Sequence, residues 1–245
     1  MTILEKLNSD DFYYADKEYL TNSALKMMQE SPTKYYLWSK GMYSYPSSSA
    51  FNIGKAVHAI FLEGIDNTVE YTKRRAGGEW LEFSEENSDK IILSSKEYHL
   101  VHSMINKLKM VSQVQDLMGD FTPEVPAIMD IQGVKMKGKA DAVTKDFRGT
   151  ILTDLKTCKS LKDFEKSAQW MGYDQQCAVY TNLFEADEFY FVAIEKEFPY
   201  DVGIYKASES FYQRGMQRLS NGLETYKDLF VNGKYIPYTA KYQEL

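Results

Sequence analysis

Two extended segments joined by a short turn, residues 134–145 and 150–157, constrain the fold more than any other feature of this chain. In each segment, successive side chains alternate between two faces with the period of two that is typical of a β-strand. The intervening Asp146-Phe147-Arg148-Gly149 has Asp at its first position and Gly at its last, which favours a tight turn. The sequence therefore predicts an antiparallel hairpin.

The predicted hairpin brings two carboxylates and a lysine together. Asp141 lies on the first strand, while Asp154 and Lys156 share one face of the second. Paired carboxylates repel each other unless a cation lies between them. A divalent cation held by carboxylate oxygens, with an ammonium group beside it, is suited to attack on a phosphodiester. A solvated acidic hairpin would have the same spacing, so the spacing alone leaves both interpretations open.

Two predicted helices carry further candidate residues. The apolar segment 51–63 contains His58, with Gly54 four residues earlier on the same helix face, where a small residue allows close approach. A lone histidine on an apolar helix is more often a core residue than a ligand. Further along the chain, Gln176 and Tyr180 lie four residues apart and so share one helix face.

Helix caps, hydrophobic periodicity and turn residues predict the order of the elements. Helices are expected first, then a three-stranded meander, a helical crossover, two more strands and a long helix, which together give an α/β fold with a mixed sheet. Residues 1–19 are expected to form an irregular arm, and the polar segment 66–90 a mobile loop. Expected helices lie near 21–30, 32–38, 51–63, 94–111, 161–170, 173–184 and 209–230, and expected strands near 122–131, 134–145, 150–157, 188–196 and 201–207.

Composition argues against several classes of protein. The net charge of −6 disfavours a protein that coats nucleic acid, although it permits a nuclease with a locally basic surface. Two cysteines without a C-x-x-C pair disfavour a structural zinc site or a disulfide framework. Because no apolar run reaches the length of a membrane span and no signal peptide is recognisable, a cytoplasmic protein without a membrane partner is expected. We expect a single domain over 1–245, with an N-terminal helical arm at 1–50, a core at 51–231 and a tail at 232–245.

Four short motifs occur in a fixed order along the chain: Gly54-x-x-x-His58, Gly138-Lys139-x-Asp141, Asp154-x-Lys156 and Gln176-x-x-x-Tyr180. In this order they resemble the PD-(D/E)XK nuclease superfamily, and within its RecB-like branch the phage and prophage exonucleases of the RecE (exodeoxyribonuclease VIII) type. Segments near 20–32, 198–200 and 233–238 extend the resemblance over most of 20–238, although similar proteins often have Trp where this chain has Tyr235. The resemblance implies a restriction-endonuclease-like core, in which helices flank a mixed central sheet, together with an N-terminal helical segment.

The resemblance also implies a metal site. The positions that match the metal-holding residues of the family are His58, Asp141, Asp154 and the backbone carbonyl of Leu155. This donor set suits Mg²⁺, and its one imidazole favours tolerance of Mn²⁺. Lys156 would position or deprotonate the attacking water, and a simple ion pair with Asp154 is the alternative.

Three more residues match positions near the metal in similar proteins. Glu124 matches an acidic position that would support a second ion or the water network, and an exposed edge glutamate is the alternative. Gln176 and Tyr180 match a motif that lies near the metal and the DNA backbone in relatives. A tyrosine with apolar neighbours is equally consistent with the core, so both interpretations of Tyr180 stay open.

Two basic groups are candidates for DNA contact. Lys137 and Lys139 share a predicted strand face with Asp141 and would form a positive track to the metal, or else protect an exposed strand edge. Arg74-Arg75, in the predicted loop, would reach the mouth of the site and hold a terminal phosphate with a planar guanidinium. A solvated loop without contact to DNA is the alternative for the two arginines.

The resemblance implies a metal-dependent exodeoxyribonuclease. Relatives of the RecE type digest linear duplex DNA from the 5′ end and leave 3′ single strands for recombination. They work as rings of identical subunits with a single-strand annealing protein, in the host cytoplasm when a phage encodes them. An endonuclease or single-strand nuclease with the same core is a second interpretation. A catalytically silent DNA-binding or scaffold protein is a third, against which the complete set of His58, Asp141, Asp154 and Lys156 argues.

Overall fold

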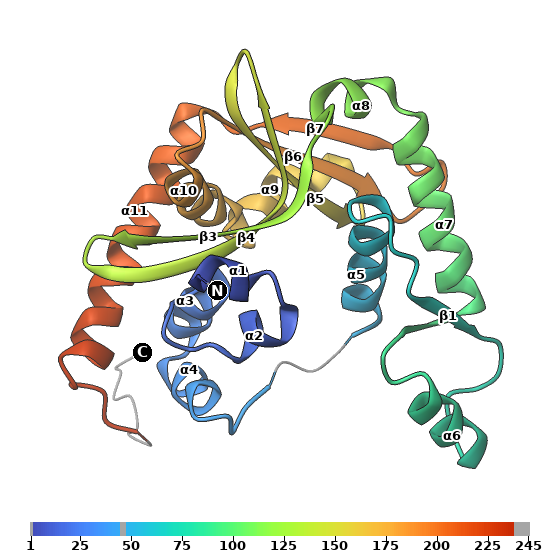
Figure 1. Cartoon of the computed structure of the whole chain (residues 1–245), viewed down its shortest axis with the longest axis horizontal. Coiled ribbons are helices and arrows are strands. Elements are labelled where there is room, and N and C mark those ends of the chain that lie inside the picture. The colour runs from blue at the N-terminus through green and yellow to red at the C-terminus, as the bar shows by residue number, and fades with distance from the viewer. Residues whose placement is uncertain (1, 45–47, 238–245) are drawn as a thin grey trace, which may run out of the picture.

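A five-stranded mixed sheet forms the centre of the structure (Figure 1). The computed structural model describes residues 2–44 and 48–237, so most of the predicted tail 232–245 lies outside the described residues. The strands follow one another in chain order across the sheet, and all neighbours are antiparallel except β5 and β6, which are parallel. The predicted fold class is confirmed. The strands are β3 (Thr122–Ile131), β4 (Val134–Asp146), β5 (Gly149–Cys158), β6 (Glu188–Glu195) and β7 (Val202–Lys206).

Helices cover both faces of the sheet, because both faces are apolar. In β6, Val192 and Ile194 pack into one core and the alternate residues Phe191 and Ala193 into another. The first core is covered by α5 (Ser49–Phe61), α7 (Ser95–Met110) and α8 (Ser112–Met118), and the second by α9 (Phe164–Trp170), α10 (Tyr173–Phe184) and α11 (Glu209–Tyr226).

The predicted hairpin forms between β4 and β5, with Asp146 and Gly149 as its last paired residues. Gly149 has a φ of +102°, and a Cβ there would lie 2.0 Å from Oδ2 of Asp187. That carboxylate accepts a hydrogen bond from the N–H of Thr150 (2.8 Å), so only glycine fits the turn. After β5, a 3₁₀ turn (Leu161–Asp163), α9 and α10 make the crossover that a parallel strand pair needs.

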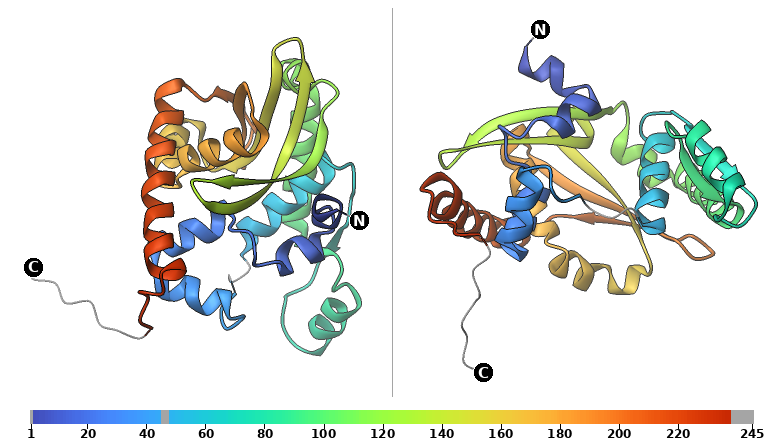
Figure 2. Two further views of the ribbon diagram at one scale, coloured as in Figure 1. Left: turned by 60° about the vertical axis from the view of Figure 1, so that its left-hand side comes forward. Right: turned by 90° about the horizontal axis from the view of Figure 1, so that it is seen from below.

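The chain begins with four helices, and the first two lie across the ribbon of β3 and β4 (Figure 2). The prediction of an irregular arm over 1–19 is wrong, because the side chains of Thr2 and Ser9 cap two short helices. A hydrophobic period cannot be recognised in helices of five and six residues. The four helices are α1 (Ile3–Leu7), α2 (Asp10–Ala15), α3 (Asn22–Glu30) and α4 (Pro32–Ser39).

The N-terminal arm also extends the sheet locally. Leu20 forms a parallel bridge with Met136 on the edge of β4 that β5 leaves free. The N–H of Leu20 donates to the carbonyl of Lys135 (2.9 Å), and the carbonyl of Leu20 accepts from the N–H of Lys137 (3.0 Å). The arm therefore satisfies backbone groups of an otherwise open strand edge.

A small appendage lies at one end of the molecule, beyond α5 and α7 (Figure 1). The parallel strands β1 (Thr68–Tyr71) and β2 (Ile91–Ser94) flank α6 (Gly78–Glu86). The ring of Tyr71 lies 5.0 Å from that of Trp80 and 4.7 Å from that of Phe83. The prediction of a mobile loop over 66–90 is therefore wrong, because these aromatic contacts give a polar segment a small core of its own.

The long predicted C-terminal helix is also present. Helix α11 continues into a π-helical turn, Lys227–Val231. Within residues 2–44 and 48–237, no helix combines the length and the apolar character needed to cross a bilayer.

Candidate metal centre at a fork between two strands

Strands β4 and β5 separate where the sequence places its two aspartates. Their pairing ends one position before Asp141 and Asp154, which the register would place opposite each other. Beyond this point the backbone of Leu155 contacts side chains and no longer pairs with the backbone of β4. Its N–H donates to Oδ2 of Asp141 (2.9 Å), and its carbonyl oxygen lies 2.7 Å from Nε2 of His58 on α5. We refer to the region formed by His58, Glu124, Asp141, Asp154 and Lys156 as the fork.

Glu124 enters the fork from β3, the other neighbour of β4. The residues on either side of Glu124 pair with those on either side of Asp141, so these two acids occupy opposite positions. Glu124 has a φ of +50°, in the left-handed region that residues other than glycine seldom adopt. Such a conformation costs about 1–3 kcal/mol and is typical of functional sites, where the surrounding structure enforces it.

Three side chains converge at the fork. Ligand atoms of His58, Glu124 and Asp141 all lie within 4.8 Å of one another, and Nδ1 of His58 is 3.4 Å from Oδ2 of Asp141. In the part of the chain that the structure describes, this is the only such group of three His, Cys, Asp or Glu side chains. Because carboxylate oxygens dominate the donor set, it fits Mg²⁺ or Mn²⁺.

The raised pKa of Glu124 also supports a cation site at the fork. The pKa of Glu124 is raised to about 7, mainly by burial and also by the nearby carboxylates of Asp141 and Glu63, while Lys139 and His58 oppose the shift. Acidic groups held this close without a counter-charge repel each other. A divalent cation between them would relieve that repulsion.

Asp154 is more deeply enclosed than the three convergent residues, since it is only 5% exposed. Its Oδ1 accepts a hydrogen bond from Nε2 of Gln176 (2.5 Å), and its Oδ2 lies 2.6 Å from Nζ of Lys156. The pKa of Asp154 is raised to about 6, mainly by burial and also by Asp141, whereas Lys156 and His58 oppose the shift. The carboxylate is thus held between α10 and its own strand.

The convergent set differs in part from the set that the sequence motifs indicate. His58 and Asp141 belong to both sets, but Glu124 takes the third position in the structure and Asp154 faces Lys156 and Gln176 instead. The carbonyl of Leu155 lies in the fork and contacts His58. The signal that would have placed Glu124 is the β3–β4 register, which motif spacing does not contain.

Lys156 carries its charge at the fork. Burial lowers the pKa of Lys156, but the carboxylates of Asp154 and Asp141 outweigh burial, so the net shift is upward. Its Nζ also lies 4.9 Å from the ring centroid of Tyr173, a residue that no sequence motif indicated. Without a bound cation Lys156 is therefore an ammonium, which donates hydrogen bonds and does not accept a proton.

Helix α10 packs tightly against β4 through Tyr180. A Cβ at Gly138 would lie 2.7 Å from Cδ1 of Leu183 and 3.3 Å from Cζ of Tyr180, so a larger residue there would require these side chains to shift. Tyr180 is half-buried and contacts two of the apolar cores. Its pKa is raised by burial and by the nearby charges of Asp141 and Asp154, so its side chain lies close to the fork as well as to the cores. Gln176 on the same helix reaches Asp154 directly.

The expectation of a close approach at Gly54 is wrong. A Cβ there would meet Oγ1 of Thr157 at 3.8 Å, which is ordinary van der Waals contact. Helix α5 therefore lies far enough from β5 to accept a Cβ at this position.

The predicted positive track along β4 is wrong. Lys137 is 1% exposed, and its Nζ donates to the carbonyl of Tyr13 (2.6 Å) and to the side chain of Asp16 (2.7 Å). Lys139 forms an ion pair with Asp10. The N-terminal arm, which the sequence did not show to be folded, neutralises both lysines and removes Lys137 from the reach of DNA.

The two arginines of the appendage have different environments. Arg75 donates to Oε2 of Glu97 (2.9 Å) and to the carbonyl of Ile92 (3.0 Å), so it ties the appendage to the first turn of α7. Arg74 is exposed. The predicted clamp of two free arginines is therefore wrong for Arg75, because this side chain has a structural role.

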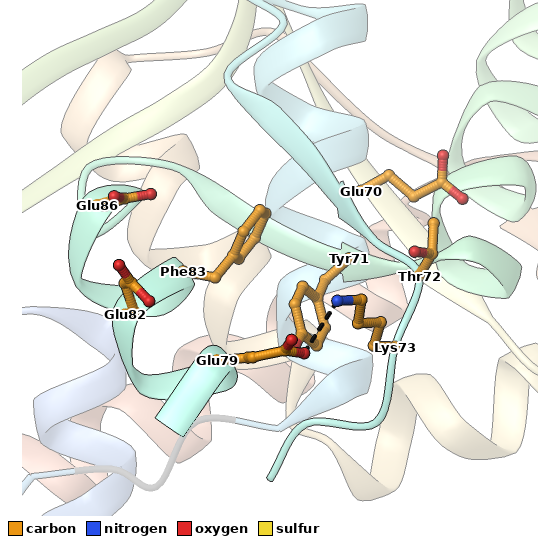
Figure 3. A pocket seen from close by; sticks show the side chains of 8 residues that line it. All are labelled: Glu70, Tyr71, Thr72, Lys73, Glu79, Glu82, Phe83 and Glu86. Carbon is orange, nitrogen blue, oxygen red and sulfur yellow. Dashed lines mark hydrogen bonds and ion pairs between the residues drawn. The ribbon is translucent and has the colours of Figure 1, made fainter. Parts of the chain in front are cut away.

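A second acidic group lies in the appendage and lacks the geometry of the fork. The pocket in Figure 3 has a volume of about 340 Å³. Glu79 pairs with Lys73 (2.9 Å), and the other carboxylates point in different directions around the rings of Tyr71 and Phe83. The pocket gives no group of three convergent ligands. Its acidic residues are Glu70, Glu79, Glu82 and Glu86.

The fold and the fork together define a class of protein. Acidic residues on adjacent strands of a mixed sheet, a histidine from a preceding helix and a lysine two residues after the last acid are the arrangement of a PD-(D/E)XK-type domain. The comparisons agree with this class. The chain belongs to the family described as "PDDEXK-like domain of unknown function (DUF3799)", whose model matches residues 21–240.

Solved structures support the fold assignment. A crystal structure of a "putative exonuclease" from Eubacterium rectale is similar with a TM-score of 0.68 and 18% identity, over 97% of this chain and 95% of that one. A crystal structure of SSO0001 aligns with a TM-score of only 0.32 and 20% identity, over 68% of this chain and 85% of that one, a similarity too low to bear on the fold. The comparison with curated proteins finds no match.

Proposed function

We propose that this protein is a Mg²⁺-dependent exodeoxyribonuclease that digests linear duplex DNA from its 5′ ends and leaves 3′ single strands for phage-type recombination. The observation that carries the proposal is the convergence of His58, Glu124 and Asp141 beside the Asp154–Lys156 pair. The family assignment and the name of the structural relative from Eubacterium rectale support the same reaction class.

The residues of the fork have separate roles in this proposal. His58, Glu124 and Asp141 hold the cation, with the carbonyl of Leu155 and the carboxylate of Asp154 as neighbouring oxygen donors. When bound, Mg²⁺, for which Mn²⁺ substitutes, lowers the pKa of a water and offsets charge on the phosphate.

Lys156 and Gln176 act on the geometry of the reaction. The ammonium of Lys156 orients the attacking water and donates to the negative charge that develops on the phosphate oxygens. Gln176 fixes the carboxylate of Asp154, and Asp154 in turn fixes Lys156. Gln176 is therefore a positioning residue.

Linear duplexes labelled at one end at a time, digested in Mg²⁺, test the proposal. We expect early release of label from 5′ ends, retention of 3′-labelled strands and no cleavage of a closed circular plasmid. Cleavage of the circle at the rate of the linear form would replace the exonuclease with an endonuclease. No cleavage in Mg²⁺ or Mn²⁺ would favour a DNA-binding protein with a nuclease fold.

The proposal extends to the assembly of the protein. A ring of identical subunits would encircle the duplex and hand the 3′ single strand to an annealing protein. Light scattering of the purified protein, with and without a duplex, measures the subunit number directly. A monomer under both conditions would contradict the ring and leave the chemistry at the fork unaffected.

A further inference from the structure

A cationic pocket lies at the amino end of α10, between α3 and α11. It has a volume of about 260 Å³, and its charged lining residues are Lys26, Glu30 and Arg218. Gly172 forms part of the wall, and a Cβ there would lie 3.6 Å from both Cε of Lys26 and Nη1 of Arg218. The two cationic side chains thus flank the same backbone position from opposite helices.

The positive charge of this pocket is only partly compensated. Burial lowers the pKa of Lys26, and so do the nearby charges of Lys156 and Arg218, whereas Glu30 and Asp174 oppose the shift. Because Lys156 belongs to the fork, its influence on Lys26 also shows that the pocket and the fork are electrostatic neighbours. A group with negative charge would be stabilised between these cations.

A buried acid and a backbone carbonyl hold Arg218 in place. Asp174 is completely buried, and its Oδ2 lies 2.9 Å from Nε of Arg214 and 3.3 Å from Nε of Arg218. Nη1 of Arg218 also donates to the carbonyl of Gln169 (3.1 Å). The side chain of Arg218 is nevertheless 43% exposed, so it is oriented and accessible at the same time.

The rim of the pocket carries an exposed aromatic residue. Trp170 is 84% exposed at the end of α9, and the following Met171 is 41% exposed. A tryptophan side chain is normally mostly buried, because it is large and mainly apolar. An accessible indole beside cationic groups is the combination that binds unpaired nucleotides, since bases stack on the ring and phosphates pair with the cations.

The chain leads directly from this pocket to the fork. Tyr173, the first residue of α10, contacts Lys156 through its ring, and Gln176 binds Asp154. Gly172 precedes Gln176 by about one helical turn, roughly 6 Å along the axis. A strand whose scissile phosphate lies at the fork therefore has its neighbouring nucleotides within reach of the pocket.

We infer that this pocket binds a nucleotide of an unpaired DNA strand next to the cleaved bond, with its phosphate between Lys26 and Arg218 and its base stacked on Trp170. The nature of the ligand rests on the proposed function. An unpaired strand is required because the bases of a duplex already stack on one another and do not offer a free face to the indole.

Fluorescence anisotropy of labelled oligonucleotides in EDTA tests the inference without cleavage. We expect Trp170→Ala to weaken binding of a single strand by roughly 5- to 150-fold, and Trp170→Phe to restore most of it. Phe147→Ala is the matched control, because Phe147 is 97% exposed at the far end of the β4–β5 hairpin. Binding of a blunt duplex should change little in any of these variants.

The salt dependence of binding tests the phosphate contact separately. Lys26→Ala should reduce the slope of log K against log salt for the single strand by about 0.7, whereas Lys73→Ala in the appendage should leave the slope unchanged. Equal effects of Trp170→Ala and Phe147→Ala, or equal loss for single and double strands, would overturn the inference. If single strands bind through Trp170 but no DNA is cleaved, the pocket is supported and the proposed nuclease activity is rejected. If DNA is cleaved but binding does not depend on Trp170, the nuclease is supported and the pocket is rejected.

Discussion

The fork and the appendage each gather acidic side chains, but in opposite ways. At the fork, Glu124 and Asp141 come from neighbouring strands and converge with His58, partly screened from solvent. In the appendage, Glu79 is paired with Lys73 while Glu82 and the remaining acids of the pocket spread around it. The same residue types are therefore strained and repulsive in one region and relaxed in the other.

The difference shows what turns acidic residues into a cation site. Solvent screens exposed charges, so an acidic helix such as α6 does not need a cation for stability. At the fork, the half-buried position of Glu124 and the nearby charge of Asp141 raise the pKa of Glu124, and a bound cation would offset that repulsion. Comparison of variants in the two regions should separate these cases.

The largest effect is expected for Asp141→Asn at the fork. The amide of asparagine can still accept from the N–H of Leu155, but the charged ligand is lost, so DNA cleavage should fall on the order of 1,000-fold. Initial rates on a linear duplex in Mg²⁺ measure the change, and circular dichroism checks the fold. The appendage variant Glu82→Gln, measured in parallel, should cleave at the wild-type rate. Comparable losses in both variants would erase the distinction between the two regions.

Lys156→Met should have the next largest effect. The variant removes the ammonium while keeping the length of the side chain, so cleavage should fall roughly 100- to 10,000-fold. Lys156→Arg keeps the charge and should recover part of the rate, although its wider head group displaces the donor. If the methionine variant were as active as the arginine variant, Lys156 would be only the ion-pair partner of Asp154.

A stability change of about 1–3 kcal/mol is expected for Glu124→Gln in EDTA at pH 8. The pKa of Glu124 is raised to about 7 in the folded protein, above the usual value of 4.5. The ionised carboxylate of Glu124 therefore lowers the free energy of unfolding above pH 7, and this effect disappears as pH falls below 4.5. The glutamine variant should be more stable than the wild type at pH 8 and similar to it near pH 4.5, as thermal unfolding would measure.

Added Mg²⁺ should reverse the order of stability at pH 8, because only the wild type has the full ligand set. Calorimetric titration should also show weaker Mg²⁺ binding to the wild type at pH 6 than at pH 8, since Glu124 then takes up a proton. A Glu124→Gln protein with unchanged stability and unchanged Mg²⁺ affinity would remove Glu124 from the site.

The smallest effect is expected when the appendage is neutralised by Glu82→Gln with Glu86→Gln. Exposed substitutions of this kind usually change stability by no more than about 0.5 kcal/mol, and Mg²⁺ affinity should stay the same. Thermal unfolding and the same calorimetric titration give the result. A clear loss of Mg²⁺ binding would reveal a second cation site in the appendage and contradict the difference between the two regions.

The sequence predicts the parts of the fork that depend on short-range order. The turn at Gly149 fixes the β4–β5 register, and that register gives Asp141 and Asp154 opposite positions on the two strands. The strand period of two places Lys156 on the same face as Asp154. The helical period of the later segment 173–184 places Gln176 on one face with Tyr180. The motifs also indicate His58, which the structure places beside Asp141.

The remaining features depend on contacts between distant segments. The resemblance indicates Glu124 only as a support for a second ion or the water network. Its place beside His58 and Asp141 comes from the pairing of β3 with β4 and from a left-handed backbone, neither of which has a signature in residue types. The burial of Lys137 requires the N-terminal arm, whose helices are too short to have a detectable period. Trp170 has no sequence signal at all, because its meaning comes from its exposure.

The ion pairs between the N-terminal arm and the lysines of β4 have a practical consequence for shortened forms of the protein. The matched family segment begins at residue 21, after Leu20 and after the acids that pair with Lys135, Lys137 and Lys139. A polypeptide trimmed to that boundary would keep the whole fork but expose a bare strand edge and a lysine without acceptors. Unpaired edges recruit the edges of other molecules. Such a truncation would therefore precipitate or oligomerise for reasons unrelated to catalysis, and an amino-terminal fusion should keep the arm intact.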